Sequence, residues 1–161
     1  MNSLAGFIEA LTSEPYHLAG SYMSDDRPDF HSCPIECDFE INHDIEALTI
    51  EGYLRELATY AFRIRMEFET ATLHGVPVEI ASQRLRELQG RLLFFGGKGM
   101  FIGRVNAGAL SAQITLERGG ISVAGALALD DRYYAFTLRG GPSSTYEALA
   151  NVVGIRSPKR A

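Results

Sequence analysis

A glycine cluster with a lysine in its middle, FFGGKGMFIG at residues 94–103, looks suited to holding a phosphate group. A phosphate-binding loop requires a glycine five residues before the Gly-Lys pair and a Ser or Thr after the lysine. Leu92 and Gly99 hold those two places here. The dinucleotide-binding pattern fails as well, because Ile102 stands where its third glycine belongs. The cluster therefore predicts a hairpin turn, since glycine readily adopts the positive φ that such turns need.

Four residues of types that bind zinc lie close together in the segment HSCPIECDFEINHD: His31, Cys33, Cys37 and His43. A Cys-x-x-x-Cys pair without a second cysteine pair matches no common closed zinc site. Two cysteines in a chain without an evident export signal are most often reduced thiols. We expect no metal and no cofactor here, with zinc binding and a Cys33–Cys37 disulfide as the alternatives.

The last predicted strand combines charged, phenolic and apolar side chains on one face. Its period of two puts Arg132, Tyr134, Phe136 and Leu138 on the same side, which we expect to face the interior. A buried arginine needs a partner, and the carboxylate of an amphiphilic ligand would supply one. The alternative is that Arg132 lies at the strand end and reaches water beside Asp130 and Asp131.

The RYY segment at residues 132–134 resembles the Arg-x-Tyr element with which fatty-acid-binding proteins hold a ligand carboxylate near the end of their chain. The resemblance implies that Arg132 and Tyr134 bind the ligand, and the period of two adds Phe136 as a ligand-binding residue on the same face. The two adjacent helices that those proteins insert after their first strand have no clear counterpart in this sequence.

Nucleophilic catalysis has little support in the sequence. No Gly-x-Ser-x-Gly motif occurs, and the serines at 143 and 144 suit a helix cap. The histidines have no partners that sequence spacing identifies, so we predict no catalytic residues. An enzyme would require a polar cluster that only the fold assembles.

The elements that must position these residues are mostly strands, because apolar and polar residues alternate along much of the chain. Strands are expected near residues 16–22, 36–41, 45–54, 62–68, 92–95, 100–105, 109–117, 121–129 and 132–139. Tight turns separate the last five, which indicates an antiparallel meander. A helix is the alternative for residues 45–57, where a 3.6-residue period also fits.

Short helices are expected near both termini and once in the middle of the chain. The helical segments are 3–12, 79–89 and 144–153, with a loop at 24–34 and a flexible tail at 155–161. The chain therefore predicts one mainly β domain, residues 1–161, with a β core at 15–140. A closed antiparallel barrel is the first choice because closure removes exposed strand edges, and a two-sheet sandwich is the alternative.

Composition limits the classes of partner. The formal net charge is −5, and no basic run of five or more occurs, so we expect no nucleic acid partner. No apolar run is long enough for a membrane-spanning helix, and the N-terminal residues lack the pattern of a signal peptide. These features predict a cytoplasmic protein.

A non-enzymatic binding role follows from this combination of features. We expect a β-barrel that holds an apolar or amphiphilic small molecule. The alternative is a protein-interaction module, such as a secreted effector or an inhibitor, that acts through its loops. A small barrel enzyme with an unrecognised site is the third class.

Overall fold

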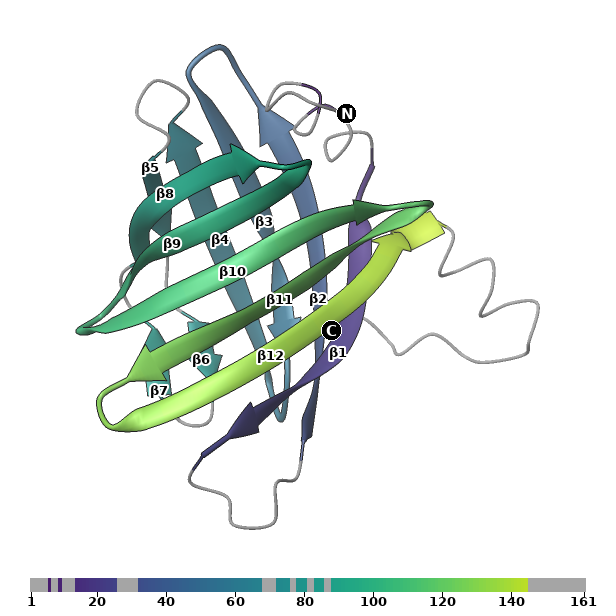
Figure 1. Ribbon diagram of the computed structural model, residues 1–161. Helices are drawn as coiled ribbons and strands as arrows, with labels where there is room; N and C mark the ends of the chain where they lie inside the picture. The colour runs from purple at the N-terminus through teal and green to yellow at the C-terminus, as the bar shows by residue number, and fades with distance from the viewer. Residues whose placement is uncertain are drawn as a thin grey trace, which may run out of the picture.

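The structure is a computed structural model that describes residues 6, 9, 14–25, 32–67, 72–75, 78–80, 83–85 and 88–144. Strands dominate these residues (Figure 1). They are β1 (Tyr16–Ser24), β2 (Cys33–His43), β3 (Ala47–Arg55), β4 (Thr59–Glu67), β5 (Thr72–Gly75), β6 (Val78–Ile80), β7 (Gln83–Leu85), β8 (Leu88–Phe95), β9 (Lys98–Val105), β10 (Gly108–Glu117), β11 (Gly120–Leu129) and β12 (Arg132–Pro142).

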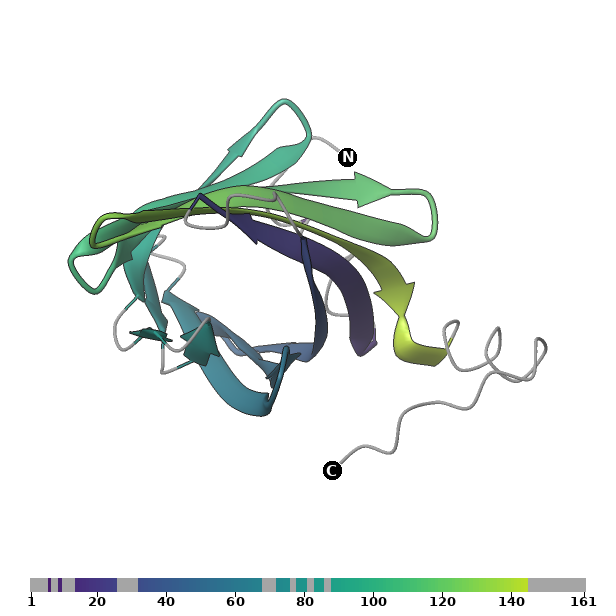
Figure 2. The same cartoon turned by 90° about the horizontal axis from the view of Figure 1, so that it is seen from below.

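The strands form a closed antiparallel barrel in the order β1-β12-β11-β10-β9-β8-β5-β4-β3-β2, and β6 and β7 pair separately. Figure 2 shows the strands curling around a common interior. The barrel predicted from the sequence is therefore confirmed, and the sandwich alternative is wrong. The barrel is closed because β1 is hydrogen-bonded to both β2 and β12.

The seam between β1 and β12 joins the first and last strands of the described chain. Its register pairs Gly20 with Leu138 and Tyr22 with Phe136. Beyond the end of β1, the backbone N–H of Asp25 donates to the Tyr133 carbonyl at 3.1 Å, and the Tyr133 N–H donates to the Asp25 carboxylate at 3.0 Å. These bonds extend the seam to the start of β12.

The last five strands form the predicted meander, with tight turns between them. Gly96 and Gly97 connect β8 to β9 with φ values of 58° and 77°. The next turns also contain positive φ, at Asn106, Gly119 and Asp130. Glycine, asparagine and aspartate tolerate positive φ better than other residues do, and they occupy the positive-φ positions of these hairpin turns.

The interior contains two neighbouring groups of buried side chains. The larger one gathers around Tyr16, Leu18, Cys37, Ile41, Leu48, Met66, Phe101 and Ile121. The second gathers around Tyr22, Ile35, Val105, Leu127, Leu129 and Tyr134. In β2, Ile35, Cys37 and Ile41 are buried on the inward side, which follows the period of two in the sequence.

Some local predictions were wrong. The helix predicted for 79–89 is absent: the described part of that range belongs to the β6–β7 hairpin and the start of β8. Helix propensity differs between these residue types by fractions of a kcal/mol, so strand pairing outweighs it. The strand expected at 45–54 is confirmed as Ala47–Arg55, so the alternative helix at 45–57 is wrong. β2 continues to His43, beyond the end of the strand predicted near residues 36–41.

The terminal predictions fall largely outside the described residues. Of the helix predicted at 3–12, the structure describes Gly6 and Glu9, which are helical. Of the helix predicted at 144–153, it describes Ser144, also helical. The tail at 155–161 and most of the loop at 24–34 lie outside the described residues, although Cys33 and Pro34 already belong to β2.

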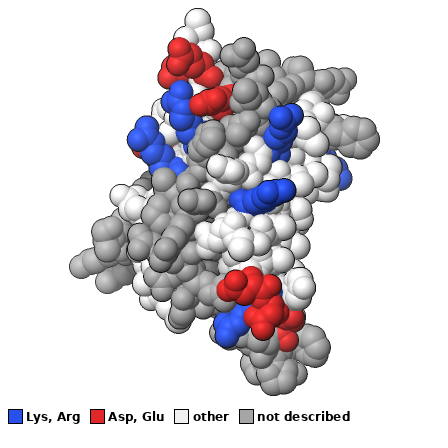
Figure 3. All heavy atoms as spheres, turned by 90° about the vertical axis from the view of Figure 1, so that its left-hand side faces the viewer, with Lys and Arg blue, Asp and Glu red and all other residues white. Residues whose placement is uncertain are grey.

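Charged side chains of both signs occur on the surface. On the face drawn in Figure 3, acidic side chains gather at the top and the bottom, with basic side chains beside and between them. Cross-strand ion pairs include Arg63 Nε with Glu51 Oε1 and Arg139 with Glu117, each at 3.1 Å. Among the described residues, no helix is long and apolar enough to cross a membrane.

Candidate functional site

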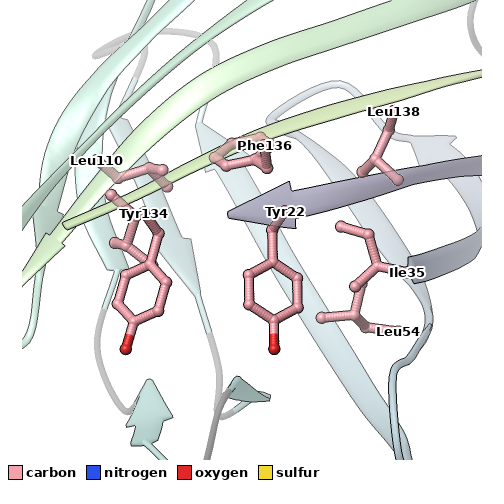
Figure 4. A pocket seen from close by; sticks show the side chains of 8 residues that line it. Tyr22, Ile35, Leu54, Leu110, Tyr134, Phe136 and Leu138 are labelled. Atoms are coloured by element: carbon pink, nitrogen blue, oxygen red, sulfur yellow. The ribbon is translucent and has the colours of Figure 1, made fainter. Parts of the chain in front are cut away.

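A cavity of about 170 Å³ lies inside the barrel beside the β1–β12 seam. Strands β1, β2, β3, β10, β11 and β12 all contribute to its wall (Figure 4). The lining side chains are Tyr22, Ile35, Leu54, Leu110, Leu127, Tyr134, Phe136 and Leu138. Apart from the two tyrosine hydroxyls, these side chains are hydrocarbon, so the cavity suits an apolar molecule.

The structure brings two of the three predicted site residues together. Tyr134 and Phe136 both line the cavity, and Leu138 follows them on the same face of β12. Arg132 shares their parity but is exposed at the first position of the strand and does not belong to the lining. The alternative placement of Arg132, at the strand end and open to water, fits this geometry.

Sequence reasoning missed Tyr22 as a site residue. Its ring lies 6.2 Å from that of Tyr134, measured between centroids, and the two hydroxyls point the same way in Figure 4. The Tyr22 hydroxyl donates to Oε1 of Glu56. Burial raises the pKa of Tyr22 above its ordinary range, and the contacts with Glu56 and Cys33 raise it further. Tyr22 is therefore a neutral phenol at physiological pH, with its proton directed at Glu56.

Tyr134 differs from Tyr22 in the state of its hydroxyl. The residue is only 4% exposed, and its Oη has no hydrogen-bond partner among the described residues. A buried hydroxyl without a partner costs about 1–3 kcal/mol. The polar atoms of the lining residues contribute no surface to the cavity, so this hydroxyl is buried behind the apolar wall and is not open to the cavity.

The small residues of β11 lie on both faces of the strand. Ala124 and Ala126 are exposed on the outer face, and of this stretch Gly125 points inward. A Cβ built on Gly125 would lie 2.6 Å from Cζ of Phe136 and 2.3 Å from the Ser111 carbonyl oxygen. The ring of Phe136 occupies the space that this glycine leaves, so Gly125 shapes the cavity through Phe136.

The glycine cluster forms the β8–β9 turn, as predicted. Lys98 is the exposed first residue of β9, and the segment that follows the glycines is a strand. A dinucleotide-binding turn leads into a helix whose N-terminus faces the phosphates. The geometry of this segment does not match that arrangement.

Cys33 and Cys37 are free thiols. Burial raises the pKa of Cys37 to about 12, so the thiol stays protonated at neutral pH. Within the described residues, no three His, Cys, Asp or Glu side chains are placed to hold a metal ion. His31 lies outside the described residues.

A separate polar cluster joins β1, β2 and β3 on the outer face of the barrel. His17 Nδ1 lies 2.6 Å from Asp38 Oδ1, and Arg55 also pairs with Asp38. Arg55 Nε lies 3.7 Å from Glu36 Oε2. These residues alternate with inward-facing ones such as Leu18 and Cys37, so the cluster binds three strands together outside the cavity.

Comparison of the sequence with protein-family models and with curated proteins found no match in either set. These two comparisons therefore supply no residue roles for this chain. The geometry of the cavity is the basis for a functional proposal.

Proposed function

We propose that this protein is a non-enzymatic binding protein that holds a small apolar or weakly polar molecule inside its barrel. The observation that carries the proposal is the cavity of about 170 Å³ with its hydrocarbon wall. Protein interiors are close-packed, and an apolar cavity of about 150 Å³ is known to bind benzene. A ligand the size of one substituted aromatic ring therefore fits.

The nature of the lining favours binding over catalysis. The described residues that line the cavity include no Asp, Glu, His, Lys, Arg, Ser or Cys. General acid–base catalysis needs a group that exchanges protons near the operating pH. Burial raises the pKa of Tyr22, so its phenol stays protonated and does not exchange a proton near neutral pH. The enzyme hypothesis is accordingly the weakest of the three.

The proposal is tested by filling the cavity. Leu110 lines it, whereas its neighbour Ala109 is exposed on the outer face. The chain contains no tryptophan, so Leu110→Trp and Ala109→Trp each introduce a single fluorescent reporter. Blue-shifted emission from Leu110→Trp alone would show that its indole ring occupies the interior.

Binding of isopropylbenzene, followed through leucine methyl NMR shifts, is the functional readout. We expect saturable binding by the parent protein and by Ala109→Trp, and none by Leu110→Trp. Native mass spectrometry beside the denatured mass would reveal a co-purified ligand. A parent protein that binds no small aromatic compound contradicts the proposal.

A second candidate is a protein-interaction module, and one observation favours it. The outer face of β9, β10 and β11 has a shallow groove of about 430 Å³, bordered by uncharged outward side chains such as Ile102, Ser111 and Ala126. Ile102 is 56% exposed. A second protein chain in the native mass spectrum, lost in Ile102→Glu but retained in Leu110→Trp, would favour this function.

A further inference from the structure

We infer that the cavity takes a pure hydrocarbon and excludes ligands of the same shape that contain a polar atom. The inference rests on the proposed function and narrows its ligand class to benzene and its alkyl derivatives, without phenols, ketones or carboxylic acids. It also replaces the Arg132-bound carboxylate that the sequence predicts. The selectivity comes from the wall of the cavity and not from its volume.

The wall is apolar over its whole surface. None of the polar atoms of the lining residues contributes surface to the cavity. Aromatic carbon comes from residues such as Phe136, and aliphatic carbon from residues such as Leu110 and Leu138. A ligand hydroxyl or carbonyl group that enters this space loses its hydrogen bonds to water and finds neither a donor nor an acceptor in the wall. A hydrocarbon of the same shape has no such loss.

The two tyrosines of the lining contribute their rings but not their hydroxyl groups. The Tyr22 hydroxyl donates to Glu56, in the turn between β3 and β4. The Tyr134 Oη is buried behind the apolar wall. Both hydroxyl groups point away from Phe136 and Leu138 in Figure 4. A ligand in the cavity therefore contacts aromatic carbon of both tyrosines and forms a hydrogen bond with neither.

An ionised ligand is disfavoured more strongly than a neutral polar one. A carboxylate loses far more hydration than a hydroxyl group does, and the described lining includes no Lys, Arg or His. Arg132 is exposed at the first position of β12 and does not belong to the lining. The expected order of affinity is hydrocarbon, then neutral polar compound, then anion.

Toluene, phenol and benzoate test this order. Toluene and phenol are nearly equal in size and differ by a methyl group in place of a hydroxyl group. Their dissociation constants are measured at pH 7 by leucine methyl NMR titration of the parent protein. We expect toluene to bind at least about tenfold more tightly than phenol, because the buried hydroxyl group has no partner. Benzoate should show no saturable binding.

A matched pair of variants separates the effect of the wall from the lower water solubility of toluene. Leu138 lines the cavity and is partly buried. Leu138→Val and Leu138→Thr introduce side chains of the same shape that differ by one hydroxyl group, and both residue types suit a strand. The preference for toluene over phenol should be at least about threefold smaller in Leu138→Thr than in Leu138→Val, because the threonine hydroxyl can bond to phenol.

Tyr134→Phe tests the position of the tyrosine hydroxyl and does not depend on either Leu138 variant. It should leave the preference for toluene unchanged, because the hydroxyl that it removes is not open to the cavity. Tyr133→Phe is the matched control, since Tyr133 is 61% exposed and points away from the cavity. Weaker phenol binding in Tyr134→Phe alone would show that the hydroxyl reaches the ligand, and the inference would be wrong.

The outcomes separate this inference from the proposed function. Phenol or benzoate as the tightest ligand of the parent protein overturns the inference and leaves the binding function standing. An equal preference for toluene in the two Leu138 variants also overturns it, because the wall would then not decide the selectivity. Failure of toluene, phenol and benzoate alike to bind the parent protein refutes both.

Discussion

At the scale of single residues, the alternation of β12 was the most informative feature of the sequence. Period two correctly grouped Tyr134, Phe136 and Leu138 on one inward face. The period of two does not predict how deeply each side chain of that face is buried. Arg132 has the same parity but starts the strand, where the barrel wall ends and water is accessible. A face is thus predictable from spacing, whereas burial depends on the neighbouring strands.

Cys37 gives the first prediction at this scale, which concerns alkaline pH. Its pKa rises from an ordinary 9.0 to about 12 through burial. Between these values the unfolded thiol loses its proton and the folded one keeps it, so its contribution to stability falls as the pH rises from about 9 to about 12. The loss approaches about 1.4 kcal/mol per pH unit for one proton.

The measurement compares the urea unfolding free energies of the parent and Cys37→Ala at pH 8 and pH 10.5. The stability advantage of the parent should shrink at the higher pH. Ionisation of the buried Tyr22 affects both proteins alike and cancels in the difference. An advantage that stays constant would mean that burial of Cys37 does not shift its pKa.

Gly125 gives the second residue-scale prediction. Gly125→Ala should destabilise the protein by about 1–3 kcal/mol, because the new methyl group would collide with the Phe136 ring and the Ser111 carbonyl. Ala126→Ser, on the exposed side of the same strand, should change stability by less than about 0.5 kcal/mol. Equal effects in chemical denaturation would show that Phe136 does not pack over Gly125.

At the scale of elements, turns were predicted better than the pairing of short segments. The glycines, the asparagine and the aspartate of the β8–β12 meander have side chains compatible with positive φ, so the turn chemistry is visible in the residues themselves. The β6–β7 hairpin has no such signal. Its strands are three residues long, and its helix-forming composition conceals a β structure that depends on tertiary contacts.

The β8–β9 turn provides a prediction that isolates backbone strain. Gly96 has a φ of 58°, and a Cβ built there meets nothing within 4 Å. Gly96→Val should therefore cost about 1–2 kcal/mol through the left-handed conformation alone, whereas Gly96→Asn should cost much less. Thermal unfolding of both variants measures the difference, with Lys98→Ala as a nearly neutral control. Similar losses for Asn and Val would point to steric contact instead.

At the scale of the whole molecule, closure of the barrel is what creates the site. Tyr22 and Phe136 are register partners across the β1–β12 seam, although they come from the first and last strands of the described chain. The alternation of apolar and polar residues predicted both strands, and the number of strands predicted a barrel. The order of strands around a barrel cannot be predicted from local residue spacing. Tyr22, Ile35 and Leu54 could therefore not be joined to Tyr134 from the sequence. The chemical state of the Tyr134 hydroxyl was equally beyond reach, because it depends on every side chain around it.

Closure itself leads to the last prediction, which concerns amide hydrogen exchange. In a closed barrel, β1 and β12 have hydrogen-bonded neighbours on both sides, so their amides should be about as protected as those of β10 and β11. The β6–β7 hairpin, bonded only to itself within the described sheets, is the internal control and should exchange much faster. Exchange measured residue by residue with NMR distinguishes closure from an open sheet, because an open edge leaves alternate amides without an acceptor. Fast exchange at every second residue of β1 or β12 would place an edge at the seam. The cavity between Tyr22 and Tyr134 would then be a groove open to water, and an apolar ligand would lose the burial that holds it.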